Sequence, residues 1–252
     1  MNVFLTVENI KLSYQTPTGE TQAIKDVSFT VGKGQFVSIV GPSGCGKSTL
    51  LSCIAGITAP TEGRIVLDGH PITGISHNIG YMLQSDNLLP WRTIYKNALL
   101  GLEIQKKLTE ENIAYACDLL KKYDLWEFRD SYPAALSGGM RQRAALIRTL
   151  AVRPGLLLLD EAFSALDYQT RVTVSQDVYN ILRSENQTMI MVTHDIPEAV
   201  SMSDRIIILS QRPATVARQV EIPFGKHRDT IGLRSTPEYR RCYDTVWKEM
   251  TR

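Results

Sequence analysis

The stretch QFVSIVGPSGCGKST, residues 35–49, combines a short β-branched strand, a glycine-rich turn and the beginning of a helix. Residues 41–49 fit the pattern G-x-x-x-x-G-K-[ST], in which successive backbone N–H groups turn inward and bind phosphate oxygens. Glycine permits this backbone because it has no Cβ, and the helix N-terminus adds partial positive charge. We expect this loop to consist of Gly41, Pro42, Ser43, Gly44, Cys45, Gly46, Lys47, Ser48 and Thr49.

Two side chains of this phosphate loop carry the expected chemistry. Lys47 can reach the β- and γ-phosphate oxygens of a nucleoside triphosphate, and Ser48 offers a hydroxyl to Mg²⁺. A glycine-rich turn that binds nothing is the alternative, but the complete spacing between a strand and a helix disfavours it. Cys45 suggests a redox switch, although a small filler side chain is the better interpretation.

A second motif follows the apolar run LLLL at residues 156–159, which predicts a strand buried on both faces. Asp160 and Glu161 come directly after it, at the carboxyl end where open α/β sheets place their ligands. We expect Asp160 to hold Mg²⁺ through its water shell and Glu161 to orient or deprotonate an attacking water. Many strands end in acidic turns, so this pattern gains its weight from the phosphate loop upstream.

A third motif, LSGGMRQR at residues 136–143, predicts the start of a helix that runs to about Ala151. Ser137 suits the N-cap, and Gly138 and Gly139 free the backbone, so this helix start is a second potential phosphate site. One nucleotide does not need two such sites in one chain. Taken alone, the motif would simply be a well-capped helix.

The order of apolar patterns predicts an α/β fold. Apolar and polar residues alternate in short stretches over residues 3–40, which predicts antiparallel strands. After residue 154, apolar strand patterns alternate with helical patterns, which predicts a mainly parallel sheet. Between about Trp91 and Arg153 the apolar period is helical, which indicates an inserted α-helical subdomain. We expect one domain over residues 1–252, with a nucleotide-binding core and N-terminal β subdomain at about 1–90 and 154–210, the helical subdomain at about 91–153 and a C-terminal extension at about 211–252.

The composition is that of an ordinary globular protein, with 43% hydrophobic and 21% charged residues among 252. The formal net charge of +2 argues against a nucleic-acid partner held mainly by electrostatics. The four cysteines lack metal-ligand spacing, which favours a reducing cytosol. No run approaches the roughly 18 apolar residues of a spanning helix, and the first residues show no signal pattern. At a membrane, the chain would need another subunit to recruit it.

Together the three motifs resemble those of the ATP-binding subunits of ABC transporters, whose signature is LSGGQ-like. The resemblance covers nearly the whole chain and implies a P-loop NTPase core of the ABC ATPase type that binds ATP and Mg²⁺ and hydrolyses ATP. In that family two subunits pair head to tail, so Ser137, Gly138 and Gly139 would face the nucleotide of the second copy. Met140 replaces the usual Gln and Ala162 a common Pro, but neither position supplies a phosphate ligand or the catalytic carboxylate.

The resemblance implies roles for further residues. Tyr14 would stack on adenine, Gln84 would sense Mg²⁺ and connect to the permease, and residues 164–167 would cross the dimer interface. His194 resembles the switch histidine that contacts the γ-phosphate and positions Glu161. Considered alone, Tyr14 would more often be a core aromatic and His194 a structural residue. Three histidines match no motif and are expected at the surface: His70, His77 and His227.

Leu88, Leu89, Pro90 and Trp91 form an apolar cluster just after Gln84. Such a cluster could pack as a satellite core under the helical insert. It could also line a groove that receives a short coupling helix from a transmembrane partner. We favour the groove.

Three classes of ABC protein remain open: the ATPase subunit of an importer, that of an exporter, and a soluble relative acting on ribosomes or DNA. Residues 86–91, 160–167, 212–214 and 237–239 resemble the nitrate, sulfonate and taurine importer group, which includes relatives that handle thiamine-precursor pyrimidines. This implies a homodimer of ATPase subunits, two transmembrane permease subunits, an indirect link to an extracytoplasmic solute-binding protein, and a peripheral position on the cytoplasmic face of the cell membrane. We expect import of a small organic or inorganic anion or of a thiamine-precursor-like compound.

Overall fold

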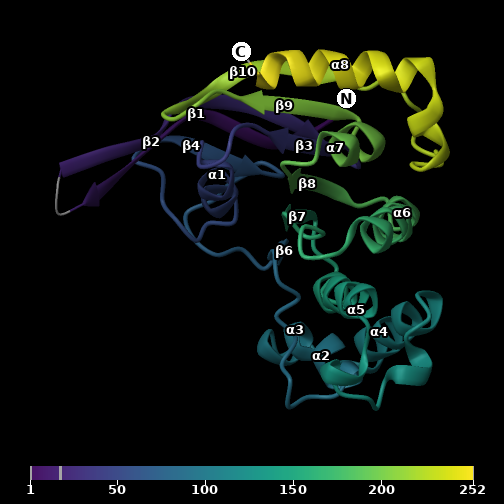
Figure 1. Cartoon of the computed structure of the whole chain (residues 1–252). Coiled ribbons are helices and arrows are strands. Elements are labelled where there is room, and N and C mark those ends of the chain that lie inside the picture. Colours follow the sequence, from purple (N-terminus) through teal and green to yellow (C-terminus); the bar gives the residue numbers. More distant parts are fainter. Residues whose placement is uncertain (1, 17–18, 252) are drawn as a thin grey trace. The chain divides into compact units, whose positions relative to one another are not determined.

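The computed structural model describes residues 2–16 and 19–251, and the chain divides into two compact units (Figure 1). The first unit consists of Met1–Ser76 together with Asn186–Arg252, and the second of His77–Glu185. Within the described residues, no helix combines the length and apolar composition that a membrane span requires.

A mixed sheet forms the first unit. Its strands are β1 (Val3–Thr16), β2 (Gly19–Gly32), β3 (Phe36–Val40), β4 (Glu62–Leu67), β5 (His70–Pro71), β8 (Thr188–Val192), β9 (Arg205–Leu209) and β10 (Ala214–Glu221). Their order is β5-β4-β1-β2-β10-β9-β3-β8. The pairs β1–β2, β1–β4 and β4–β5 are antiparallel, which confirms the expected N-terminal antiparallel strands. Strand β3 lies between β8 and β9 and is parallel to both.

The helices of the first unit are α1 (Lys47–Ile54), α7 (Ile196–Met202), η3 (Gly232–Ser235) and α8 (Pro237–Met250). Helix α8 lies along β9 and β10 (Figure 1) and buries Tyr239 and Val246 against the apolar side chains of Ile206 and Ile208. All five residues of β3 are buried, as expected of a central strand covered on both faces. The strand β3, which leads into the phosphate loop, therefore gives that loop a rigid attachment to the sheet.

The second unit combines the parallel strands β6 (Ile79–Met82) and β7 (Leu156–Asp160) with helices. The helices are α2 (Ile94–Ala98), α3 (Leu100–Ile104), α4 (Glu110–Lys122), η1 (Trp126–Phe128), η2 (Pro133–Ala135), α5 (Gly138–Leu150) and α6 (Tyr168–Ser184). The four leucines of β7 are fully buried, which confirms the strand expected there. Acidic residues begin α4 and basic residues end it, in agreement with the helix dipole.

The helical subdomain expected at about 91–153 lies inside the second unit. The second unit covers more residues than the expected subdomain, because it also includes β6, β7 and α6. The division of the chain into subdomains at the expected bounds remains a proposal.

Candidate functional site

The phosphate loop joins the buried strand β3 to helix α1 in the first unit. Gly44 and Gly46 have φ angles of 71° and 111°, in the left-handed region that glycine adopts without strain. A Cβ on Gly41 would lie 3.0 Å from Sγ of Cys45 and 3.0 Å from the carbonyl oxygen of Leu209. These positions therefore require glycine.

Lys47 supplies a fixed positive charge to this loop. Its side chain is only 6% exposed, and Nζ donates to the carbonyl oxygens of Gly41 and Pro42, each at 2.9 Å. A buried ammonium is costly unless it is hydrogen-bonded, and these two carbonyls satisfy that requirement. A glycine-dependent backbone with a cation held against it fits a bound phosphate chain.

Tyr14 and His194 both lie near the phosphate loop within this unit. The ring of Tyr14 is 41% exposed and its hydroxyl donates to Oγ1 of Thr49 at 3.3 Å, so Tyr14 is not a core aromatic. Because Val192 of β8 pairs in parallel with Ile39 of β3, the segments after both strands leave the same edge of the sheet. His194 is exposed at that edge. The roles expected for both side chains remain predictions.

Three of the expected magnesium and catalytic residues, Gln84, Asp160 and Glu161, lie in the second unit near the carboxyl ends of β6 and β7. The hydroxyl of Tyr81 donates to Oδ2 of Asp160 at 3.1 Å. Nε2 of Gln84 donates to Oγ of Ser164 at 3.2 Å, and that hydroxyl donates to the carbonyl oxygen of Glu161 at 2.9 Å. The unit thus places Gln84, Asp160 and Glu161 at one sheet edge, where Glu161 is contacted through its backbone carbonyl. Tyr81 is a partner that the sequence reasoning missed.

The signature motif begins helix α5 as expected. Oγ of Ser137 accepts a hydrogen bond from a backbone N–H of the first turn at 3.3 Å, which confirms the N-cap. A Cβ on Gly139 would lie 2.8 Å from Cγ2 of Val174, and one on Gly138 would lie 3.1 Å from Cδ2 of Leu166. The two glycines therefore let α5 approach α6 and the loop of residues 164–167 closely.

Two arginines of α5 hold the segment that follows Gln84. Nε of Arg141 donates to Oδ2 of Asp86 at 3.0 Å. Arg148, two turns further along, donates to the carbonyl oxygens of Asp86 and Asn87 at 2.8 and 2.6 Å. These contacts link the Gln84 segment to the signature helix. The sequence reasoning missed them, although the i, i+7 spacing of the two arginines on one helix face was an available signal.

The apolar cluster at residues 88–91 divides into a buried and an exposed part. Leu88 is 7% exposed and belongs to the core, whereas Trp91 is 71% exposed. A groove of about 340 Å³ lies beside Trp91. Its lining residues are Trp91, Arg92, Lys96, Leu99, Glu103 and Leu108.

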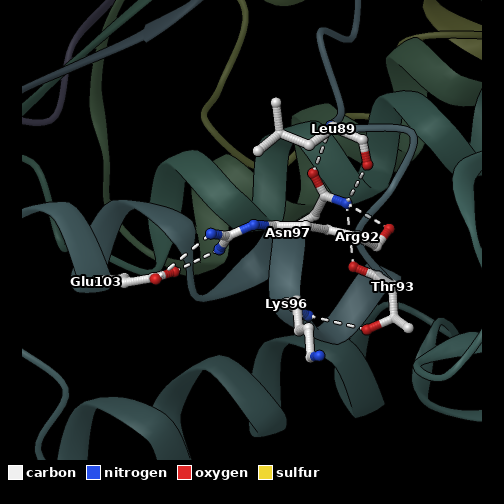
Figure 2. Close-up of polar contacts among 6 residues, drawn as sticks. All are labelled: Leu89, Arg92, Thr93, Lys96, Asn97 and Glu103. Carbon is white, nitrogen blue, oxygen red and sulfur yellow. Dashed lines mark hydrogen bonds and ion pairs between the residues drawn. The ribbon is translucent and has the colours of Figure 1, made fainter.

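Asn97 fixes the backbone that presents Trp91 (Figure 2). Its side chain is fully buried, and Oδ1 accepts from the backbone N–H of Leu89 at 2.7 Å. Nδ2 lies 3.1 Å from the carbonyl oxygen of Leu89 and 3.0 Å from those of Arg92 and Thr93. Arg92 forms an ion pair with Glu103 on the groove wall. A single buried amide therefore determines the course of residues 89–93.

Comparison with known proteins places these motifs in one family. Residues 24–164 match the family model described as ABC transporter. An uncharacterized ABC transporter ATP-binding protein of Bacillus subtilis (strain 168) is 46% identical over 248 residues, 98% of this chain and 95% of that protein. An aliphatic sulfonates import ATP-binding protein of Bacillus cereus is 37% identical over 90% of each chain.

A solved structure agrees with these relatives. The ATP-binding cassette MJ0796, in a dimeric post-hydrolysis state bound to ADP and Pi, has a TM-score of 0.73 and 31% identity, covering 88% of this chain and 100% of that one. The family match extends over more than half of the chain and includes the phosphate loop, the signature and Glu161. The chain therefore belongs to the ABC transporter family, as an ATP-binding subunit that binds ATP with Mg²⁺ and hydrolyses it.

Proposed function

We propose that this chain powers a binding-protein-dependent importer by hydrolysing MgATP. The observation that carries the proposal is the glycine-dependent phosphate loop with its buried Lys47, in a chain that also holds an acidic strand end and a capped signature helix. Relatives that align with the chain are named as import ATP-binding proteins for nitrate and aliphatic sulfonates.

Several side chains take part in nucleotide binding in this proposal. Lys47 pairs with the β- and γ-phosphate oxygens, and Tyr14 stacks on the adenine ring, a contact worth about 1–3 kcal/mol per base. Ser48, Gln84 and Asp160 hold Mg²⁺, Asp160 through water. When bound, Mg²⁺ neutralises charge on the phosphate oxygens. The exposure of Tyr14 beside Thr49 supports its part.

Glu161 acts as the general base of the hydrolysis in this proposal. It accepts the proton of the attacking water, and His194 contacts the γ-phosphate and keeps Glu161 in position. The position of Glu161 directly after the buried strand β7 supports this role, because a rigid strand limits where its backbone lies.

Two copies pair head to tail in the working assembly. The signature residues Ser137, Gly138 and Gly139 of one copy then contact the nucleotide bound by the other. The solved cassettes that resemble this chain are described as dimeric, which supports the arrangement. The N-terminus of α5, with a capped first turn and two glycines, has the backbone donors that an anion requires.

The groove beside Trp91 receives a short helix from a transmembrane permease subunit, so that two such subunits bind the two copies of the chain. These subunits hold the chain at the cytoplasmic face of the membrane and connect it indirectly to a solute-binding protein. Two features support the groove: Trp91 is open to it, and Asn97 fixes the segment that carries Trp91. An exposed aromatic on a fixed backbone loses little conformational entropy when it is covered by a partner.

Trp91→Ala tests the docking surface. A buried aromatic anchor commonly costs about 2 kcal/mol or more when truncated, so we expect permease affinity to fall at least about tenfold. The melting temperature should hardly change, because Trp91 is 71% exposed in the chain alone. Ile104→Ala is the matched control, since Ile104 is 70% exposed and does not line the groove. Normal co-purification of Trp91→Ala with the permease would remove the groove from the proposal.

The transported compound is a small anion, such as nitrate, bicarbonate or an aliphatic sulfonate, or a thiamine-precursor-like pyrimidine. Support comes from the relatives named for nitrate, sulfonate and bicarbonate transport. The test is uptake into proteoliposomes that contain this chain, the permease encoded beside it and the neighbouring solute-binding protein. Accumulation of one of these compounds with MgATP inside supports import. Extrusion, or uptake of an unrelated compound class, contradicts it.

A further inference from the structure

A hollow of about 350 Å³ lies among α4, α5 and α6 of the second unit. Its size falls within the range of about 300–1,000 Å³ that is usual for small-molecule sites. None of the phosphate or magnesium residues lines it, and the signature motif contributes only its last residue, Arg143. The nucleotide chemistry therefore leaves this hollow unexplained.

Among the described residues, Arg143, Asp124 and Asp177 line this hollow and form no direct ion pair. Lys122 is already paired, because its Nζ donates to Oε1 of Glu185 at 2.7 Å and to Oγ of Ser184 at 3.1 Å. Within the described part of the chain, Arg143 makes one long hydrogen bond, from NH1 to the carbonyl oxygen of Tyr123 at 3.5 Å, and its buried Nε has no partner. The guanidinium of Arg143 is therefore weakly satisfied.

Asp177 and Asp124 supply the negative charge of the hollow. Burial raises the pKa of the Asp177 carboxyl, the positive charge of Arg143 lowers it, and the like charge of Asp124 raises it further. Arg143 thus acts on Asp177 through space and not through a hydrogen bond. With Lys122 neutralised by Glu185, one guanidinium and two carboxylates face a common space.

We propose that this hollow binds a small zwitterion, with its acid group on Arg143 and its ammonium between Asp124 and Asp177. A ligand with one charge would satisfy only one sign and leave the other groups without a partner. Carboxylate or sulfonate suits the guanidinium, which can donate two parallel hydrogen bonds. The ammonium separates two carboxylates that otherwise repel each other.

The bound zwitterion is an effector of ATP hydrolysis. Arg143 lies on α5, whose first residues carry the signature, and Asp177 lies on α6, which directly follows residues 164–167. A ligand that bridges Arg143 and Asp177 holds the two helices together. This second step rests on the proposed function, whereas binding itself does not.

Calorimetric titration of the full chain without nucleotide tests the binding. The probes are 4-aminobutyrate and taurine as zwitterions, and butylamine and butyrate as compounds with a single charge. We expect the zwitterions to bind saturably, with a Kd below about 1 mM, and the single-charge probes to bind at least about tenfold more weakly. Absence of saturable zwitterion binding overturns the site, and equal binding of butyrate or butylamine overturns the zwitterion.

Asp124→Asn is the decisive variant because it should fold normally. Asp124 is exposed and has φ of 56°, a conformation that Asn tolerates well. We expect it to weaken zwitterion binding at least about tenfold, with Arg143→Gln showing a similar loss. Asp118→Asn, an exposed carboxylate of α4 outside the hollow, should bind normally. Unchanged affinity in Asp124→Asn overturns the proposed pairing.

Steady-state ATPase activity separates the two steps. Saturating 4-aminobutyrate should change the rate of the wild-type chain and leave that of Asp124→Asn unchanged. Binding without any change in rate overturns the effector role alone. If the chain binds the probe but hydrolyses no ATP under any condition, the proposed function fails while the binding site stands.

Discussion

At the scale of single residues, Lys47 is the side chain of the phosphate loop whose substitution should most affect ATPase activity. Its ammonium is buried and held by two carbonyl oxygens, so Lys47→Ala removes a fixed cation from the phosphate loop. We expect ATPase activity to fall about 10²–10³-fold, as for the loss of one preorganised electrostatic contact. The assay is steady-state phosphate release, with the exposed Lys25→Ala as control. Near-normal turnover of Lys47→Ala contradicts the phosphate-loop assignment.

Cys45 gives a second prediction at this scale. It is 1% exposed, and burial raises the pKa of its thiol, while burial raises that of Cys53 to about 11. The thiolate is the reactive form, so both should resist iodoacetamide at neutral pH. Peptide mass spectrometry should find Cys117 and Cys242, which are only half-buried, labelled before Cys45 and Cys53, with ATPase activity retained. Rapid labelling of Cys45 would favour a redox switch over the filler interpretation.

Residue types at fixed spacing could name candidate site residues, because each motif depends on a strand and the turn directly after it. The roles of these residues remain predictions. Asn97 could not be found in this way, and the spacing of Arg141 and Arg148 indicated a shared helix face but not their partners. The partners of Asn97 and Arg148 are carbonyl oxygens of residues 86–93. The sequence pattern does not predict where a backbone carbonyl lies in an irregular segment.

At the scale of elements, Asn97→Ala tests how the segment before α2 is held. The variant removes the amide that accepts from the N–H of Leu89 and contacts the carbonyl oxygen of Arg92, whereas the carbonyl oxygens of Leu89 and Thr93 keep a backbone donor. We expect the free energy of unfolding in urea to fall by about 1–3 kcal/mol. Asn112→Ala, whose amide makes an exposed hydrogen bond to Lys107, should cost much less.

Asn97→Ala should also weaken permease binding more than Asn112→Ala does. Release of residues 89–93 lets the exposed Trp91 move, and ordering it again on binding costs conformational entropy. A variant that loses stability yet binds the permease with full affinity would show that Asn97 stabilises the fold without presenting Trp91.

Elements with a local cause were predicted well. Ser137 caps α5 because its hydroxyl can reach the first turn, and β7 is buried because four leucines leave it no polar face. Burial of Leu88 and exposure of Trp91 could not be separated from the sequence, since both are large apolar residues in one short cluster. Their difference depends on tertiary packing, which a short run of large apolar residues does not specify.

At the scale of the whole molecule, the proposed nucleotide residues come from both units. The phosphate loop and His194 belong to the first unit, and Gln84, Asp160, Glu161 and the signature belong to the second. Local patterns predict each group inside its own unit. The proposal that both groups and a second copy act on one MgATP concerns the assembly, and a variant that binds without hydrolysing can test it.

Glu161→Gln is that variant. The amide keeps the size of the side chain and can still donate and accept hydrogen bonds, but it cannot take the proton of the attacking water, so we expect hydrolysis to fall about 10²–10⁴-fold. ATP binding should persist, because the Lys47 contacts of the phosphate loop are untouched.

If the signature of each copy covers the nucleotide of the other, uncleaved MgATP joins two chains. Size-exclusion chromatography should then show a dimer of Glu161→Gln with MgATP and a monomer without it. Lys47→Ala combined with Glu161→Gln should stay monomeric, because the shared nucleotide is lost. A monomer of Glu161→Gln with ATP bound would contradict both the base and the head-to-tail pair, whereas a dimer that forms without nucleotide would contradict only the pairing through ATP.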